Sequence, residues 1–327
     1  MFFDTILPLL LFPTISALAG ILILPNVAEV EPFFRTQCPP GSKHYIPLSR
    51  NPAVDETLCL LIFVFHTGLE TKEVMSPFVS YFLATVVPPV MLFISIESSR
   101  KGRRFVVSYT SLISGVFAQV VSFAVSMPIF WLYFILSARF VKGRVTQIHA
   151  EASVLGMLIG WVIPSIFLVT HVDPVITVAW NFAPITSFIS QLLPMLLRAP
   201  TTKSGFRTVQ VAYVVCFLVA ASVHIKMAMD EFSTLSSMQT FFVPTLREKE
   251  IPRAVLNVFQ WDFALGVGAC MLGSLWFARN AAEVATIALW YPVASVFVGP
   301  GAAFTAVALC RESFLEDALA KGKVKAS

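Results

Sequence analysis

Charged residues are scarce in this sequence. Only 13% of its 327 residues are Asp, Glu, Lys or Arg, whereas a soluble globular protein has about 25%. So few charges cannot cover a water-facing surface of this size, so most of the surface must face an apolar medium. The hydrophobic content of 57% and the 30 phenylalanines agree with this. The composition therefore predicts an integral membrane protein and argues against an ordinary soluble domain.

Several signatures of catalytic sites are also missing. The histidines are scattered, without HxxxH or HxxHH spacing, which excludes the ligand sets of membrane di-iron hydroxylases and desaturases. The absence of an NDxxD-type acid pair argues against a magnesium-dependent prenyltransferase, which needs two carboxylate clusters. No Walker A, GxGxxG or GxSxG motif is present. The sequence therefore offers no motif for binding nucleotide phosphates or for a serine hydrolase. We expect neither a metal nor another cofactor.

Cysteine and basic residues add two further exclusions. The five cysteines show no CxxC or metal-ligand spacing, and no disulfide is needed to explain their positions. The net charge is only +4, and the lysines and arginines stand in short clusters between apolar runs. This pattern is typical of loops that set membrane orientation, not of a nucleic-acid-binding face.

Long apolar runs dominate what remains. A helix needs about 20 mostly apolar residues to cross a bilayer. The candidate spans are 5–24, 54–71, 77–97, 105–138, 149–170, 174–197, 207–225, 254–278 and 282–309. We therefore expect an all-α, polytopic transmembrane bundle of about nine spans, between eight and ten, in one integral membrane domain covering 1–327. The run 105–138 is too long for one untilted span; it either projects from the membrane or breaks near Pro128.

Two loops and a tail complete the expected organisation. The proline-rich residues 25–53 cannot form a regular helix, residues 226–253 form a second long loop, and 311–327 form a basic C-terminal tail. With nine spans, 15 of the 23 lysines and arginines fall on the side of this tail. The positive-inside rule then predicts a cytosolic tail and a lumenal N-terminus.

Ionisable side chains within spans are candidates for function. Asp262 lies about a third of the way along 254–278, close to Asn257, Gln260 and Trp261 at helical spacings. Its apolar surroundings favour a neutral carboxylic acid that could donate a proton. The alternative is a structural hydrogen bond to a neighbouring helix.

Two further acids are candidates with strong structural alternatives. Asp55 stands at the start of 54–71, where an acid also complements the helix dipole. Glu97 stands at the end of 77–97, just before the basic residues Arg100 and Lys101, with which it could simply pair.

Five stretches carry a family resemblance: 52–66 (PAVDETLCLLIFVFH), 77–82 (PFVSYF), 97–102 (ESSRKG), 180–184 (WNFAP) and 259–262 (FQWD). Together they resemble the fungal membrane-bound terpene cyclases of the ascofuranone and ascochlorin type, a group related to membrane proteins of indole-diterpene gene clusters. The resemblance covers roughly residues 45–310. It implies a metal-independent cyclase of secondary metabolism.

The resemblance implies a substrate and a reaction. A carboxyl group would protonate the epoxide of a lipophilic prenyl-aromatic or terpenoid chain, and a ring would close. A base would then remove a proton from the carbocation, or a nucleophile would quench it. The substrate would come from a prenyltransferase and an epoxidase, and the protein would sit in the endoplasmic reticulum membrane. The sequence leaves two other functions open, a metabolite transporter and a non-catalytic membrane scaffold.

Carried over by position, the resemblance also assigns residues. Asp262, Asp55 and Glu97 become the candidates for proton donor and base. Two tryptophans would stabilise the cation, and two amides would orient the substrate or the acid. These substrate-binding candidates are Trp180, Trp261, Asn181 and Gln260.

Overall fold

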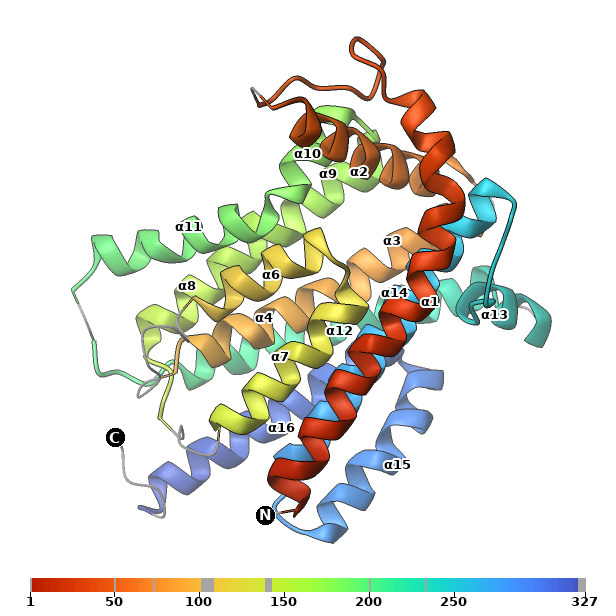
Figure 1. The fold of residues 1–327 in the computed structure, drawn as a ribbon. Coiled ribbons are helices and arrows are strands. Elements are labelled where there is room, and N and C mark those ends of the chain that lie inside the picture. The colour runs from red at the N-terminus through yellow and green to blue at the C-terminus, as the bar shows by residue number, and fades with distance from the viewer. Residues whose placement is uncertain are drawn as a thin grey trace.

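A computed structural model describes residues 2–49, 51–72, 74–100, 109–138, 143–199, 201–232 and 234–322. Within these ranges the chain is built of helices, which pack into one elongated bundle (Figure 1). The α-helices are α1 (Leu7–Gln37), α2 (Pro52–Glu70), α3 (Met75–Thr85), α4 (Val87–Ser98), α6 (Thr110–Val120), α7 (Phe123–Ala138), α8 (Gln147–Met157), α9 (Ile163–His171), α10 (Pro174–Asn181), α11 (Ala183–Leu197), α12 (Phe206–Asp230), α13 (Leu235–Phe242), α14 (Ile251–Ser274), α15 (Ala281–Phe297) and α16 (Pro300–Ala320). The remaining helical turns are η1 (Phe2–Ile6) and η2 (Leu158–Val162), both π-helical, and the 3₁₀ turn η3 (Leu275–Phe277).

Six of the described helical segments are long and apolar enough to cross a membrane, and α10 with α11, bent by 60°, would make a seventh. The all-α membrane bundle is thus supported, but the expected count of about nine spans is not confirmed. Two of the expected spans change direction within the run. The run 282–309 turns at Gly299, whose φ of +86° favours glycine, and 174–197 bends at Phe182, between α10 and α11.

The run 105–138 is also a pair of helices, as far as it is described. Residues 105–108 lie outside the described part. The chain breaks at Val121 and Ser122, not at Pro128, which stays inside α7. In Figure 1, α6 and α7 run in opposite directions and form a hairpin that leaves and returns at the same end of the bundle.

The first and last helices of the described chain, η1 and α16, reach one end of the bundle, which we call the terminal end. The indole N–H of Trp276, at the end of α14, donates to the carbonyl of Phe3 at 3.0 Å. The guanidinium of Arg279 lies 4.2 Å from the ring centre of Phe314. Figure 1 shows the same arrangement. The prediction of nine spans put the two termini on opposite sides of the membrane, an arrangement that this packing of the described chain does not favour.

The long N-terminal helix corrects one expected loop. α1 continues through Pro25 and Pro32 to Gln37, so the loop expected over 25–53 is reduced to 38–51. Each proline removes one helical hydrogen bond, which membrane helices tolerate when neighbouring elements pack against the kink. The expected loop 226–253 likewise contains the end of α12 and all of α13, and the expected tail contains the second half of α16.

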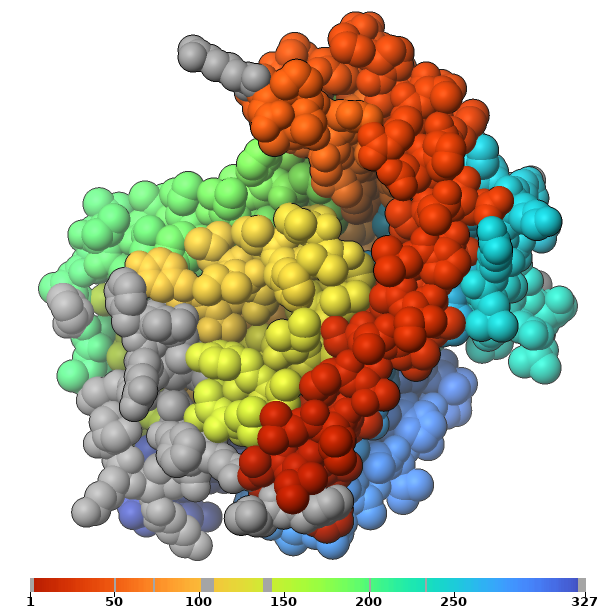
Figure 2. Space-filling view, in the orientation of Figure 1, coloured from red at the N-terminus to blue at the C-terminus, as the bar shows by residue number. Residues whose placement is uncertain are grey.

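Close packing of α14 against α7 forms one side of the core. A β-carbon at Gly266 would lie 2.2 Å from the ring of Phe123, and one at Gly273 would lie 2.2 Å from that of Trp131. Only glycine therefore allows this approach. α1 crosses the outer face of the bundle beside α7 (Figure 2).

Candidate functional site

An apolar cavity of about 450 Å³ lies between α3–α4, α8–η2–α9 and α12. Helix irregularities shape its walls: Pro88 and Pro89 stand where α3 gives way to α4, and the π-helical η2 separates α8 from α9. π-Helical turns are frequently found at functional sites. The volume falls within the usual range for small-molecule sites, about 300–1,000 Å³.

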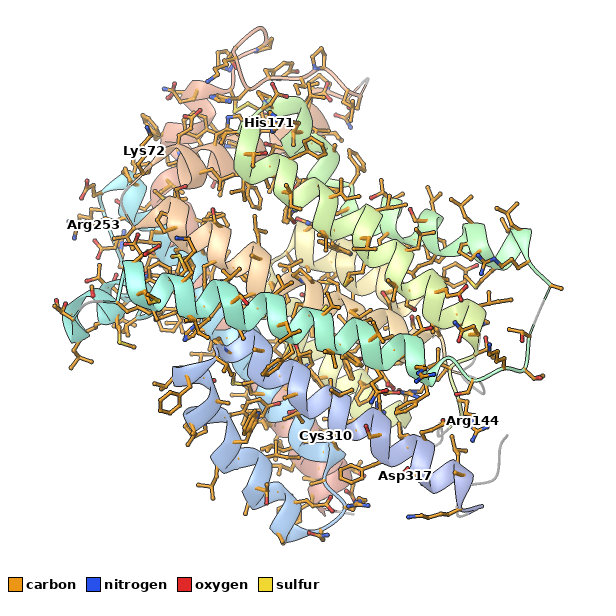
Figure 3. The ribbon with its side chains drawn as sticks, turned by 180° about the vertical axis from the view of Figure 1, so that it is seen from behind. Lys72, Arg144, His171, Arg253, Cys310 and Asp317 are labelled. Atoms are coloured by element: carbon orange, nitrogen blue, oxygen red, sulfur yellow. A yellow bond between two sulfur atoms is a disulfide. The ribbon has the colours of Figure 1, made fainter. Side chains whose placement is uncertain are left out.

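The cavity opens onto an apolar flank of the bundle. Three of its lining residues, Ile166 on α9 and Val215 and Val219 on α12, are 58%, 53% and 49% exposed. Figure 3 shows α12 from behind: it begins beside α8 and diverges from α9, which ends at the labelled His171. The exposed apolar side chains around the opening suit the entry of a lipophilic molecule.

Tyr81 is the most deeply buried polar residue of the cavity wall. Its hydroxyl lies 2.8 Å from Nδ1 of His224, and Nε2 of His224 lies 3.1 Å from the carbonyl of Val296. The carbonyl can only accept a hydrogen bond, so Nε2 carries a proton and the neutral imidazole accepts the Tyr81 hydroxyl proton at Nδ1. A β-carbon at Gly299 would lie 2.7 Å from the imidazole, so this turn closes tightly over His224.

Trp180 stands just behind the same wall. Its indole N–H donates to the hydroxyl of Ser165, a cavity-lining residue, at 2.9 Å. Its ring centre lies 4.8 Å from that of Phe65 on α2 and 6.2 Å from that of Trp161 on η2. The neighbouring Asn181 donates to the carbonyl of Thr177 at 2.8 Å. Within the part of the chain that the structure describes, Trp180 is the one substrate-binding candidate of the four whose side chain hydrogen-bonds a residue of this wall.

Gln260 and Trp261 hold the segment between α13 and α14. The amide of Gln260 donates to the carbonyls of Thr240 and Phe241, both at 2.8 Å. The indole N–H of Trp261 donates to the carbonyl of Thr245, also at 2.8 Å. Neither residue lines the cavity.

Asp262 lies at the break between α6 and α7. Its Oδ1 accepts the backbone N–H of Ala124, in the first turn of α7, at 2.7 Å. The first N–H groups of a helix have no partner within the helix, so Asp262 satisfies one of them from α14. The structure thus favours the structural alternative for this acid.

Asp55 lies at the opposite end from the termini. Its Oδ1 accepts the backbone N–H groups of Leu48 at 3.2 Å and Ser49 at 2.8 Å. This buried carboxylate joins the start of α2 to loop 38–51. It is not among the residues that line the cavity.

Glu97 belongs to a buried ion cluster at the terminal end. It binds Nε of Arg100 at 2.6 Å and Nη2 of Arg311 at 3.1 Å. Arg100 also pairs with Glu312, which lies 3.3 Å from Arg311. The cluster ties α4 to α16. Asp262, Asp55 and Glu97 therefore lie in three different surroundings and are not brought together.

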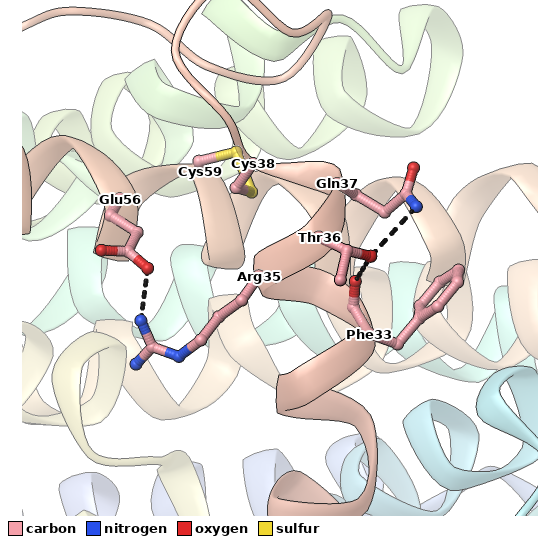
Figure 4. Close-up of a disulfide and its surroundings, with 7 residues drawn as sticks. All are labelled: Phe33, Arg35, Thr36, Gln37, Cys38, Glu56 and Cys59. Atoms are coloured by element: carbon pink, nitrogen blue, oxygen red, sulfur yellow. Dashed lines mark hydrogen bonds and ion pairs between the residues drawn. A yellow bond between two sulfur atoms is a disulfide. The ribbon is translucent and has the colours of Figure 1, made fainter.

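A disulfide between Cys38 and Cys59 joins the end of α1 to α2 (Figure 4). The sequence pattern had not required one. Arg35 and Glu56 pair beside it. We call this the disulfide end of the bundle.

Two imidazoles lie close to each other at the disulfide end. The ring centres of His44 and His66 are 4.9 Å apart, and His66 Nε2 lies 3.1 Å from the hydroxyl of Thr177. Burial lowers the pKa of His44, and the neighbouring His66 and Lys43 lower it further. No group of three or more His, Cys, Asp or Glu suited to a metal ion occurs among the described residues.

Sequence reasoning missed the Tyr81–His224 pair. Tyr81 lies in the stretch 77–82 that carries the family resemblance. His224 lies near the end of the apolar run 207–225, and an ionisable residue in such a run indicates a candidate functional site. Their pairing could not be found, because the two residues are 143 positions apart.

The fold and cavity define a multi-pass helical membrane protein with an apolar site that opens onto its flank. The sequence model of the CtvD domain family matches residues 35–315, and the chain belongs to this family. The family name is tied to gene clusters of fungal secondary metabolism, which links the chain to that biosynthesis. No curated protein and no solved structure matches the chain.

Proposed function

We propose that this protein is a membrane-bound cyclase that opens an epoxidised prenyl chain and closes a ring. The observation that carries the proposal is the apolar cavity with Tyr81 in its wall, hydrogen-bonded to His224 behind it. Membership of the CtvD family supports a role in fungal secondary metabolism. The substrate would be a lipophilic prenyl-aromatic or terpenoid epoxide, supplied by prenyltransferase and epoxidase reactions.

Tyr81 and His224 can supply both proton transfers. The reaction starts from the pair with one proton more than in the neutral state described above, carried on Nδ1 of His224. In the first transfer, His224 gives this proton to the Tyr81 hydroxyl while that hydroxyl gives its own proton to the epoxide oxygen, the carbon–oxygen bond breaks, and an alkene electron pair forms the ring bond. In the last, the carbon next to the cation gives its proton to Tyr81 Oη, whose own proton returns to Nδ1. The product is an isomer of the substrate, and the protein ends in its initial protonation state.

The cavity wall suits a cationic reaction. Its lining is largely aliphatic, which keeps water from trapping the cation before the ring closes. None of Asp262, Asp55 and Glu97 lines the cavity, so the proposal assigns them to structure and gives the proton transfers to Tyr81 and His224.

The test is a membrane assay without added metal or nucleotide. Membranes containing the protein, and matched membranes without it, would receive an epoxyfarnesyl phenol. We expect a product of unchanged mass and new retention time only where the protein is present. Unchanged substrate across a panel of prenyl epoxides would reject the cyclase proposal and favour a transporter or scaffold.

We further propose an orientation in the endoplasmic reticulum membrane. A disulfide needs an oxidising compartment, which puts the Cys38–Cys59 end in the lumen. The terminal end carries Arg144, Lys203 and Lys321, as the positive-inside rule requires of the cytosolic side. Both termini would then face the cytosol.

A further inference from the structure

A second cavity continues the first one toward the terminal end. It has a volume of about 590 Å³ and lies between α8 and α12. Met157, Leu158 and Val215 line both cavities. The two cavities therefore adjoin along α12, and we call them together the α8–α12 groove; Tyr81 lines the part farther from the terminal end.

The mouth of this groove carries two unpaired cations. Lys203 and Arg207 line it, both are exposed, and neither has an ion-pair partner among the described residues. Two acids beside the mouth are shared with other cations: Glu151 pairs with Arg198 and also attracts Lys203, and Glu316 pairs with Arg144 at 3.4 Å. These cations outnumber the two acids, so the mouth keeps an excess of positive charge above apolar walls.

Backbone contacts hold the two sides of the mouth together. The N–H of Gln147 donates to the carbonyl of Lys203 at 2.8 Å, and the N–H of Gly205 donates to that of Val145 at 2.9 Å. The side chain of Gln147 is engaged by Glu151 and Thr208. The position of Lys203 is thus set by the fold rather than by a loose loop.

The groove is long. Arg207 and His224 stand 17 positions apart on α12, which is about 25 Å at 1.5 Å per residue. That distance suits an extended geranylgeranyl chain, or a farnesyl chain with an aromatic head.

We infer that the groove binds an amphiphile with an anionic head group, a carboxylate or phenolate, held by Lys203 and Arg207. Its apolar chain runs between α8 and α12 and brings its far end to Tyr81. The inference rests on the proposed function for the identity of the reacting end, but the binding mode can be tested without turnover.

The probe is a long-chain fatty acid with a diazirine at its terminal carbon, compared with the alcohol of the same chain. Purified protein in lipid nanodiscs would be irradiated, and labelled peptides identified by mass spectrometry. We expect the acid to label peptides of α3 and α9. In the Lys203→Gln/Arg207→Gln variant, labelling by the acid should fall about tenfold while labelling by the alcohol stays constant. Lys249→Gln/Arg253→Gln, outside the groove, is the control and should leave both unchanged.

Three results would overturn the inference: equal labelling by acid and alcohol, no loss in the double variant, or labels outside the groove. Displacement of the probe by added phosphatidylserine would also overturn it, by identifying the mouth as a phospholipid site. Labelling that depends on the charge of the probe, without any epoxide turnover, would support the binding mode in the groove and reject the cyclase proposal. Isomer formation with labelling that does not depend on charge would support the cyclase and reject the binding mode.

Discussion

The amide of Asn257 donates to Oδ1 of Asn26 at 2.9 Å, and this bond joins two helices across 231 positions of the chain. Both side chains are buried, at 1% and 0% exposure. Asn26 also accepts the N–H of Glu248 at 3.2 Å, and Asn257 accepts that of Thr245 at 2.7 Å. The pair thus fixes α1, α14 and the segment before α14 as one unit.

Replacing Asn26 by Leu should destabilise this unit. The Asn257 amide and the Glu248 N–H would each lose a partner, and a buried unsatisfied group costs about 1–3 kcal/mol. Thermal unfolding of purified protein would measure the loss. Asn26→Leu/Asn257→Leu should be less stable still, because the Thr245 N–H then loses its acceptor as well. A single variant as stable as wild type would contradict the proposed role of the bond.

Tyr81→Phe should abolish most of the isomer formation. General acid–base catalysis contributes about 10²–10⁴-fold, so the rate should fall at least about 100-fold with the amount of folded protein unchanged. Tyr291→Phe is the matched control: this buried tyrosine bonds Ser274 and lies outside the cavity. Equal rates for the wild type and the Tyr81 variant would remove the pair from the mechanism.

Asp262 distinguishes the structural role from the catalytic one. Asp262→Asn keeps an acceptor for the Ala124 N–H, so it should turn over at a rate close to wild type. Asp262→Ala should lose about 0.5–2 kcal/mol of stability, as for a lost helix cap. Rate per folded molecule and melting temperature would be measured for both. A folded Asp262→Asn protein without turnover would restore this carboxyl group as a proton donor.

Removing Glu97 should be among the most damaging single changes. Glu97→Gln leaves Arg100 and Arg311 with only Glu312 as a partner in the cluster described here, and breaking a buried ion pair costs about 3–5 kcal/mol. We expect a loss of folded protein in detergent, seen by size-exclusion chromatography. Glu283→Gln is the control, because its pair with Arg279 is at the surface and should contribute about 1 kcal/mol or less.

Loss of the disulfide should loosen the disulfide end of the bundle. The bond closes a loop of 21 positions, for which a stabilisation of about 2–4 kcal/mol is typical. Cys59→Ser should lower the melting temperature, and wild type alone should change mobility on reducing gels. Cys310→Ser, at an exposed free cysteine, should have no effect. Cytosolic rather than lumenal reactivity of Cys38 in the Cys59 variant would contradict the orientation.

Much of the architecture follows from local sequence. Long apolar runs with few charges specify membrane helices because each helix satisfies its own backbone hydrogen bonds. Helix starts are equally local: Asn51 caps α2 ahead of Pro52, and Asp173 caps α10 ahead of Pro174. These features establish a helical membrane protein without reference to any distant residue.

Tertiary structure decided the rest. At the turn between α6 and α7, the Ala124 N–H is bonded by Asp262 of α14. A hydropathy pattern cannot predict such a contact between distant residues. The pairs Tyr81–His224 and Cys38–Cys59 arise only when separate elements pack. Composition and periodicity report what each helix must bury, but the partner it is buried against is set by complementary contacts between helices far apart in the chain. The sequence therefore determined the kind of protein and the named acids, whereas the packing determined which side chains reach the cavity.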